Sequence, residues 1–105
     1  MGNVYDAALF VANWPERRAE HWRALLRARA IENQCYVAGV NRVGMDGNGH
    51  RYCGDTSIVD PMGQVVKSVR DEEAIISGTF RAATLNEYRS KFPAWMDADE
   101  EMISI

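Results

Sequence analysis

The chain has 105 residues, of which 47% are hydrophobic and 26% are charged, and it carries a formal net charge of −3. This length allows one domain at most, with the composition of an ordinary soluble protein. The slightly negative charge argues against nucleic-acid binding, and the absence of any apolar run of about 18 residues argues against a membrane span.

The first part of the chain predicts a strand, a tight turn, a long helix and a second strand. Residues 7–12 form an apolar run of strand length, which residues 13–15 interrupt. Pro15 suits a first helical position because its missing N–H would have no partner there. Apolar residues then recur at helical spacing over residues 16–33, and residues 35–40 are again apolar. We therefore expect a βαβ crossover between two strands of one sheet.

Turn residues divide the second part of the chain. Residues 45–49 contain Asp-Gly and Asn-Gly, which tolerate positive φ and favour a hairpin turn or short loop. Residues 60–63, Asp-Pro-Met-Gly, have the sequence of a type I turn. Residues 84–87 have capping-box spacing and predict a short helix through about Lys91. The strands predicted between these signals are residues 50–53, 56–59, 64–69 and 74–80.

Segments spread along the chain carry a family resemblance. They are ANWP, HW and LLRARAIENQCYVAGVNRVG in the first part, then GDTSIVDPMGQVV, and finally EYRSKFPAWMDAD. Together they resemble the carbon-nitrogen hydrolase (nitrilase) superfamily, most closely its omega-amidase-like branch. The resemblance implies an α/β fold, the C-terminal half of an α-β-β-α sandwich, with about five to six strands, one long helix and one short helix. Residues 1–105 would then be one partial domain, with no separate second domain.

The resemblance also implies that the chemistry lies outside this chain. In that family a cysteine attacks the amide carbon, a glutamate transfers the proton and a lysine stabilises the oxyanion. All three precede the strand that residues 7–12 resemble, and none can be placed in this sequence. We therefore predict no catalytic residue here and an inactive chain, whose intact parent hydrolyses a small amide through covalent catalysis. No cofactor and no metal are implied.

Residues of catalytic type in this chain have structural explanations. Cys35 follows a helix end and enters an apolar strand, where a thiol pKa rises, so we expect a buried structural cysteine there and at Cys53. His50, Asp55 and Ser57 have the identities of a triad. On an extended strand, however, His50 and Ser57 would lie about 23 Å apart. The spacing of the histidines and cysteines fits no common structural zinc site.

Asn13 and Trp14 are the predicted substrate-binding residues. They occupy the strand-to-helix turn at the C-terminal end of a strand, which is the edge where α/β sheets bind ligands. The resemblance places this turn beside the nucleophile of the intact enzyme. The alternative is that Asn13 caps the helix and Trp14 only packs.

The helix over residues 16–33 has two expected faces. Its apolar stripe predicts core packing, and the resemblance implies that the face around His21 and the arginines joins copies of the protein into a homo-oligomer. Arg29, Glu32 and Asn33 match the family's RAxEN motif and are expected to form an internal polar network that fixes the helix against the sheet.

Two further expectations concern function and location. A half-sandwich leaves an apolar surface bare, so the alternative function is a small non-catalytic α/β module that self-associates. No constellation of residues supports a third possibility, a small independent enzyme. Because no signal-peptide pattern opens the chain and its two cysteines are far apart in sequence, we expect a cytoplasmic protein with free thiols.

Overall fold

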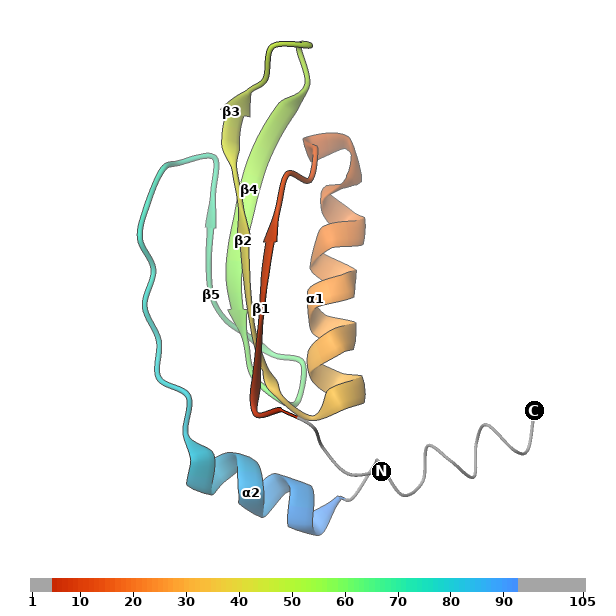
Figure 1. Ribbon diagram of the computed structural model, residues 1–105, viewed down its shortest axis with the longest axis vertical. Helices are drawn as coiled ribbons and strands as arrows, with labels where there is room; N and C mark the ends of the chain where they lie inside the picture. The colour runs from red at the N-terminus through yellow and green to blue at the C-terminus, as the bar shows by residue number, and fades with distance from the viewer. Residues whose placement is uncertain (1–4, 93–105) are drawn as a thin grey trace, which may run out of the picture.

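The computed structural model describes residues 5–92, which form a five-stranded mixed sheet with one long and one short α-helix (Figure 1). Neither helix of this range has the length and apolar character needed to cross a membrane. The predicted α/β class is confirmed. The elements in chain order are β1 (Ala7–Ala12), the 3-10 helix η1 (Glu16–Arg18), α1 (Ala19–Asn33), β2 (Tyr36–Asn41), β3 (Val43–Met45), β4 (Arg51–Val59), β5 (Val65–Arg70) and α2 (Ala82–Lys91).

The strands β1 and β2 are parallel neighbours, joined by α1. Their register runs from Ala7 opposite Tyr36 to Ala12 opposite Asn41. The helix ends after Asn33, as predicted, because Gln34 turns into the left-handed region with φ of 46°. This conformation lets the first amides beyond the helix bond back to its last turn, and the chain then enters β2.

The rest of the sheet is antiparallel and centred on β4, which pairs with β2, β3 and β5. The two strands predicted at 50–53 and 56–59 are one strand, bent where Gly54 and Asp55 both have positive φ. The predicted turn at 60–63 is confirmed by a hydrogen bond of 2.9 Å from the Gly63 N–H to the Asp60 carbonyl.

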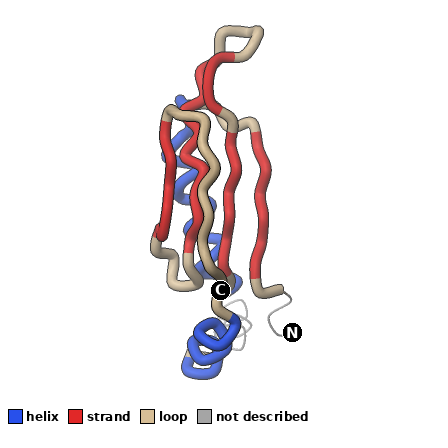
Figure 2. Tube along the Cα trace, turned by 90° about the vertical axis from the view of Figure 1, so that its left-hand side faces the viewer, coloured by secondary structure: helices blue, strands red, loops and turns tan. Residues whose placement is uncertain are grey.

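The strand predicted at residues 74–80 is wrong, since this segment pairs with no strand of the described range. It runs as a loop across the sheet face opposite α1 (Figure 2). Lys67 donates a hydrogen bond to the Ser77 carbonyl, and the Phe80 ring stacks on Tyr36 with ring centroids 4.7 Å apart. The segment therefore meets the sheet face at single points, while Ile75 stays almost fully exposed, and an apolar sequence pattern cannot distinguish such a loop from a paired strand.

The short helix begins earlier than predicted. α2 starts at Ala82, and Thr84 lies inside the helix with no capping-box hydrogen bond. Two alanines, which favour helix strongly, extend the helix back to Arg81, whose carbonyl accepts the Leu85 N–H at 3.0 Å. The remainder of the similar segment EYRSKFPAWMDAD, from residue 93, lies outside the described residues.

The core lies between α1 and one face of the sheet. Apolar residues of α1 at helical spacing are buried against β1, β2 and β4, and the helix approaches β2 most closely at Gly39. A Cβ atom at Gly39 would lie 2.6 Å from a methyl carbon of Leu26. The buried cluster consists of Trp22, Leu26, Ala30, Cys35, Val37 and Val59, with Ala8, Phe10, Ala12 and Trp14 packed against it.

We expect Gly39→Ala to lower the free energy of unfolding by about 1–3 kcal/mol, because the added methyl overpacks the contact between α1 and β2. Urea titration of the purified chain would measure this. Gly47→Ala is the matched control, because a Cβ atom there meets nothing within 4 Å. Equal stability of the two variants would contradict this account of the packing.

Candidate functional site

The turn after β1 and the end of β2 lie at the same edge of the sheet. Because the two strands are parallel and Ala12 is opposite Asn41, the turn that follows β1 lies beside Asn41, which bonds to Trp14. This is the carboxyl edge of the parallel pair, where α/β sheets bind ligands. The structure therefore places Asn13 and Trp14 at the edge that the sequence predicted for them.

Asn41 clamps this turn. Its side-chain Oδ1 accepts the Trp14 N–H at 2.8 Å, and its Nδ2 donates to the Trp14 carbonyl at 2.9 Å and to the Gly54 carbonyl at 3.0 Å. The side chain is buried. Sequence reasoning missed this residue, although its place as the polar end of an apolar strand parallel to residues 7–12 was a usable signal.

Trp14 is half-buried and packs on the core, as the structural alternative for this residue proposed. Its ring lies 6.1 Å from that of Trp22, and its Nε1–H donates to the Arg18 carbonyl at 2.6 Å. Asn13 is exposed and does not cap the helix, since Pro15 holds the position before the first helical turn. Asn13 is thus available at the sheet edge, and its role in substrate binding stays a prediction.

A second polar anchor joins α1 to the bend of β4. Arg23 donates from Nη2 to Asp55 Oδ2 at 2.8 Å and from Nε at 3.1 Å, while Trp22 Nε1–H donates to the Asp55 carbonyl at 2.9 Å. The hydrogen bond to Asp55 raises the pKa of Arg23 above its ordinary value. The carboxylate is almost fully buried, so the pair fixes the helix to the sheet at a point that sequence reasoning missed.

The predicted internal network of the RAxEN motif is wrong in its location. Arg29 and Glu32 form an ion pair, and Asn33 donates to the Arg29 carbonyl, but about half of each charged side chain is exposed. The pair lies on the outer surface of α1. Residues three or four apart bond along any helix surface, so the motif alone does not tell which face it occupies.

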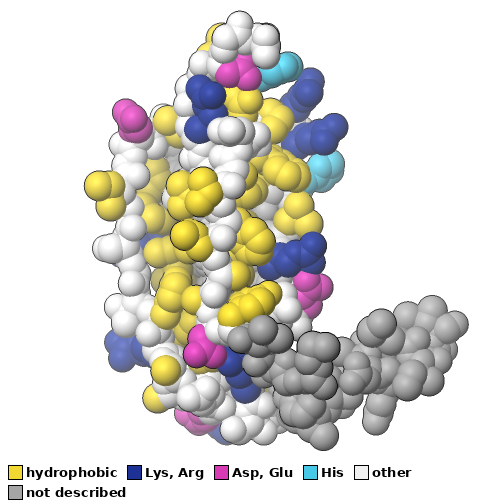
Figure 3. Space-filling view, viewed as in Figure 1, with side chains coloured by type: hydrophobic (Ala, Val, Ile, Leu, Met, Phe, Trp, Pro, Cys, Tyr) yellow, Lys and Arg dark blue, Asp and Glu magenta, His cyan; other side chains and the backbone are white. Residues whose placement is uncertain are grey.

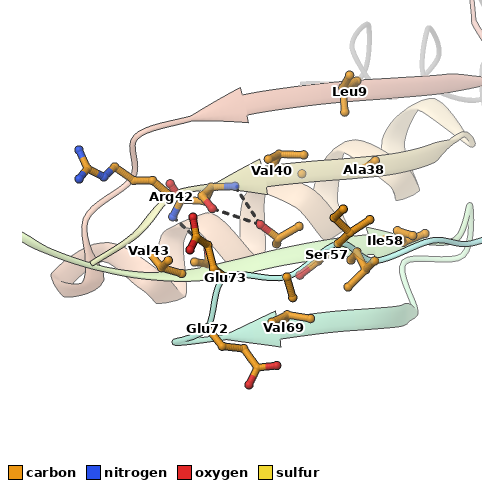
Figure 4. A pocket seen from close by; sticks show the side chains of 17 residues that line it. Leu9, Ala38, Val40, Arg42, Val43, Ser57, Ile58, Val69, Glu72 and Glu73 are labelled. Carbon is orange, nitrogen blue, oxygen red and sulfur yellow. Dashed lines mark hydrogen bonds between the residues drawn. The ribbon is translucent and has the colours of Figure 1, made fainter. Parts of the chain in front are cut away.

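The sheet face opposite α1, the open face, is apolar and only partly covered. Leu9 and Val11 are 68% and 76% exposed, and the loop of residues 72–76 lines one side of a groove of about 620 Å³ (Figure 4). Figure 3 shows apolar side chains gathered along the sheet. Aliphatic groups dominate the floor of the groove, which suits burial against another apolar surface more than bond-making chemistry. The open face is defined by Leu9, Val11, Val40, Ile58 and Val69.

Both cysteines are buried, as predicted. Burial raises the pKa of the Cys35 thiol and of the Cys53 thiol, and Cys53 also donates a hydrogen bond to Asp55. A protonated, buried thiol is a weak nucleophile, so neither cysteine has the environment of a reactive one.

The three residues of triad identity have other partners. The Asp55 carboxylate binds Arg23, the Ser57 hydroxyl donates to the Asp55 carbonyl at 2.8 Å, and the His50 N–H closes the β3–β4 turn on Asp46. The carboxylate therefore orients no histidine. Over residues 5–92, no group of three or more His, Cys, Asp or Glu side chains is arranged to hold a metal ion.

Comparison with known proteins gives one consistent family. The family model for carbon-nitrogen hydrolase matches residues 6–90. The omega-amidase YafV of Escherichia coli K12 is 57% identical over 99 residues, which span 93% of this chain and 39% of that protein. The 2-oxoglutaramate amidase of Bacillus subtilis is 37% identical over 95 residues, 90% of this chain and 36% of that protein.

The solved structure of a CN-hydrolase superfamily protein from Xanthomonas campestris has the same fold, with a TM-score of 0.86 and 53% identity. The structural match covers 89% of this chain and 35% of the Xanthomonas chain. The predicted nitrilase-type fold is therefore confirmed. The chain spans well under half the length of the relatives that it matches.

We expect the free energy of unfolding to fall as pH rises above about 8.5, because the unfolded thiols lose their protons there while the raised pKa values keep the folded thiols protonated. Below that pH the thiols should cause no pH dependence. Urea titrations across this range would measure the slope, and Cys35→Ala should reduce it. An unchanged slope in that variant would contradict the assignment.

Proposed function

This chain belongs to the carbon-nitrogen hydrolase family, and we propose that it is the C-terminal part of an omega-amidase-like enzyme. In this proposal residues 1–105 form one partial domain without a separate second domain. The observation that carries the proposal is the 57% identity to an omega-amidase over nearly the whole chain, although the match covers only 39% of that enzyme. The bare apolar open face also supports it, since further polypeptide of such an enzyme would bury that surface.

In the intact parent we propose a two-step amide hydrolysis. A cysteine sulfur attacks the amide carbon, a lysine stabilises the oxyanion, and ammonia leaves with a proton from a glutamate. Water then cleaves the thioester and releases the carboxylic acid, which regenerates the thiol. This chain supplies none of the three catalytic groups in the proposal, and the buried Cys35 and Cys53 support that assignment.

The proposed substrate is a small amide of a dicarboxylic acid, and the proposed binding residues in this chain are Asn13 and Trp14. Their place at the carboxyl edge of the parallel strands supports the role, as does the exposure of Asn13. The proposal includes no cofactor, no nucleic acid and a cytoplasmic location. The bacterial amidase relatives and the two free thiols are consistent with that location.

We further propose that the parent is a homo-oligomer through helix 16–33. Leu25 of α1 is 40% exposed beside β1, where a second subunit could cover it. The second candidate function is a non-catalytic module that self-associates, and the exposed Leu9 and Val11 favour it. The two proposals use different surfaces, because Leu25 lines the groove between α1 and β1 while Leu9 lines the groove on the open face.

The purified chain should release no ammonia from 2-oxoglutaramate. A hybrid in which it replaces the matching 99 residues of the E. coli enzyme should hydrolyse this amide. In the hybrid, Asn13→Ala should lower kcat/KM by roughly tenfold, because a pocket contact is lost. Asn48→Ala, in the exposed β3–β4 loop, is the matched control. Hydrolysis by the chain alone, abolished by Cys35→Ser, would overturn the proposal.

Sedimentation at micromolar concentration should separate the two association surfaces. If helix 16–33 joins subunits, Leu25→Glu gives a monomer and Leu9→Glu leaves the oligomer intact, because a charge buried in an interface is strongly unfavourable. If the open face self-associates, the variant on the open face gives a monomer and Leu25→Glu leaves the oligomer intact. A wild-type chain that stays monomeric would count against both surfaces.

A further inference from the structure

We infer that Asn41 is a positioning residue for the substrate-binding edge, because it fixes the backbone of Trp14 and thereby the conformation of the turn at residues 13–14. The link from this turn to substrate rests on the proposed function. The clamp, by which we mean the two hydrogen bonds between the Asn41 side chain and the Trp14 backbone, does not rest on it, since both bonds lie within residues 5–92.

The Asn41 amide holds both backbone groups of one residue. It accepts the Trp14 N–H at 2.8 Å and donates to the Trp14 carbonyl at 2.9 Å, as a neighbouring peptide would in a sheet. Trp14 lies outside every helix and strand of the described range, so this side chain takes the place of a strand partner. Loss of the amide would leave polar backbone groups without their partner.

The Asn41 side chain also bonds to β4, and the Asn41 backbone bonds to β4 separately. The second Nδ2 proton is donated to the Gly54 carbonyl at 3.0 Å, and the Asn41 N–H is donated to Thr56 Oγ1 at 3.1 Å. Gly54 has φ of 80°, and a Cβ atom there would lie 2.9 Å from a Val43 methyl carbon. The Gly54 backbone is therefore held in a conformation that suits glycine alone.

The Trp14 ring is held separately from the Trp14 backbone. Its Nε1–H bonds to the Arg18 carbonyl, and its ring packs beside Trp22. The ring therefore stays in contact with η1 and α1 even when the Asn41 amide no longer bonds to the Trp14 backbone. Removal of the Asn41 amide should therefore loosen residues 13–14 locally, while the core beneath stays folded. This separation makes positioning distinguishable from general stability.

Few side chains could replace Asn41. An aspartate carboxylate accepts the Trp14 N–H but has no proton for the two carbonyls, and its charge would be buried against them. A serine hydroxyl is too short to reach both the Trp14 backbone and the Gly54 carbonyl. The clamp thus needs an amide of asparagine length, with one acceptor and two donors used at once.

Amide hydrogen exchange of the 105-residue chain tests the clamp. In the wild type the Trp14 N–H should be protected although it lies in no helix or strand, and free exchange there would overturn the inference. In Asn41→Ser its exchange should be about tenfold faster, the effect of one lost hydrogen bond, while the Val37 amide of the same strand stays unchanged. Equal acceleration at both amides would mean a stability effect and would overturn the positioning role.

Thr56→Val is the matched control. It removes the hydroxyl that bonds the Asn41 backbone but leaves the Asn41 amide in place, so Trp14 protection should persist. Loss of Trp14 protection in this variant to the same degree as in Asn41→Ser would overturn the assignment to the side chain. The wild-type measurement decides the clamp even if the serine variant does not fold.

The hybrid enzyme tests the link to substrate. Asn41→Ser should raise KM by roughly tenfold with a smaller change in kcat, because a misplaced binding turn weakens ground-state and transition-state contacts alike. An active hybrid with unchanged KM would overturn the positioning role. An inactive wild-type hybrid would overturn the proposed function, and the exchange of the Trp14 amide would still decide the clamp.

Discussion

The contact between α1 and β2 is the constraint on which the rest of this structure depends. Trp22 and Leu26 lie so close to the backbone of β2 that only Gly39 fits beneath them. This contact fixes the helix along the parallel pair β1–β2, and the ion pair between Arg23 and Asp55 fixes it to β4. The position of the carboxyl edge, and with it the turn of residues 13–14, follows from that docking.

One-sided burial is the second consequence of the docking. α1 covers a single sheet face, and the loop of residues 72–80 crosses only part of the other, so Leu9 and Val11 remain largely exposed. A monomer rarely exposes a contiguous apolar surface of this kind unless something binds it. The relatives that this chain matches are more than twice its length, and their additional polypeptide is a natural source of such cover.

The thiols and the Asp55 carboxylate within residues 5–92 are held in contacts that stabilise the fold. The thiols of Cys35 and Cys53 are buried, and burial raises their pKa values further above neutral pH. The Asp55 carboxylate forms an ion pair with Arg23 and so connects α1 to the sheet. What the edge does offer is a backbone turn whose Trp14 N–H and carbonyl are both held by the Asn41 side chain.

The sequence by itself determined the elements whose signals are local: the strand of residues 7–12, the helix that ends at Asn33, the turn at 60–63 and the buried cysteines. Spacing, turn residues and apolar runs act over a few residues, so they can be recognised without a fold. Family membership was also evident from the sequence. Tertiary structure alone decided the rest. Asn41 meets Trp14 across 27 positions and Arg23 meets Asp55 across 32, contacts that exist only once the crossover brings those strands and that helix together. For the same reason the segment at 74–80 became a loop over the sheet and the Arg29–Glu32 pair faced outward, because the face that an apolar or charged residue occupies depends on what the whole chain packs beside it.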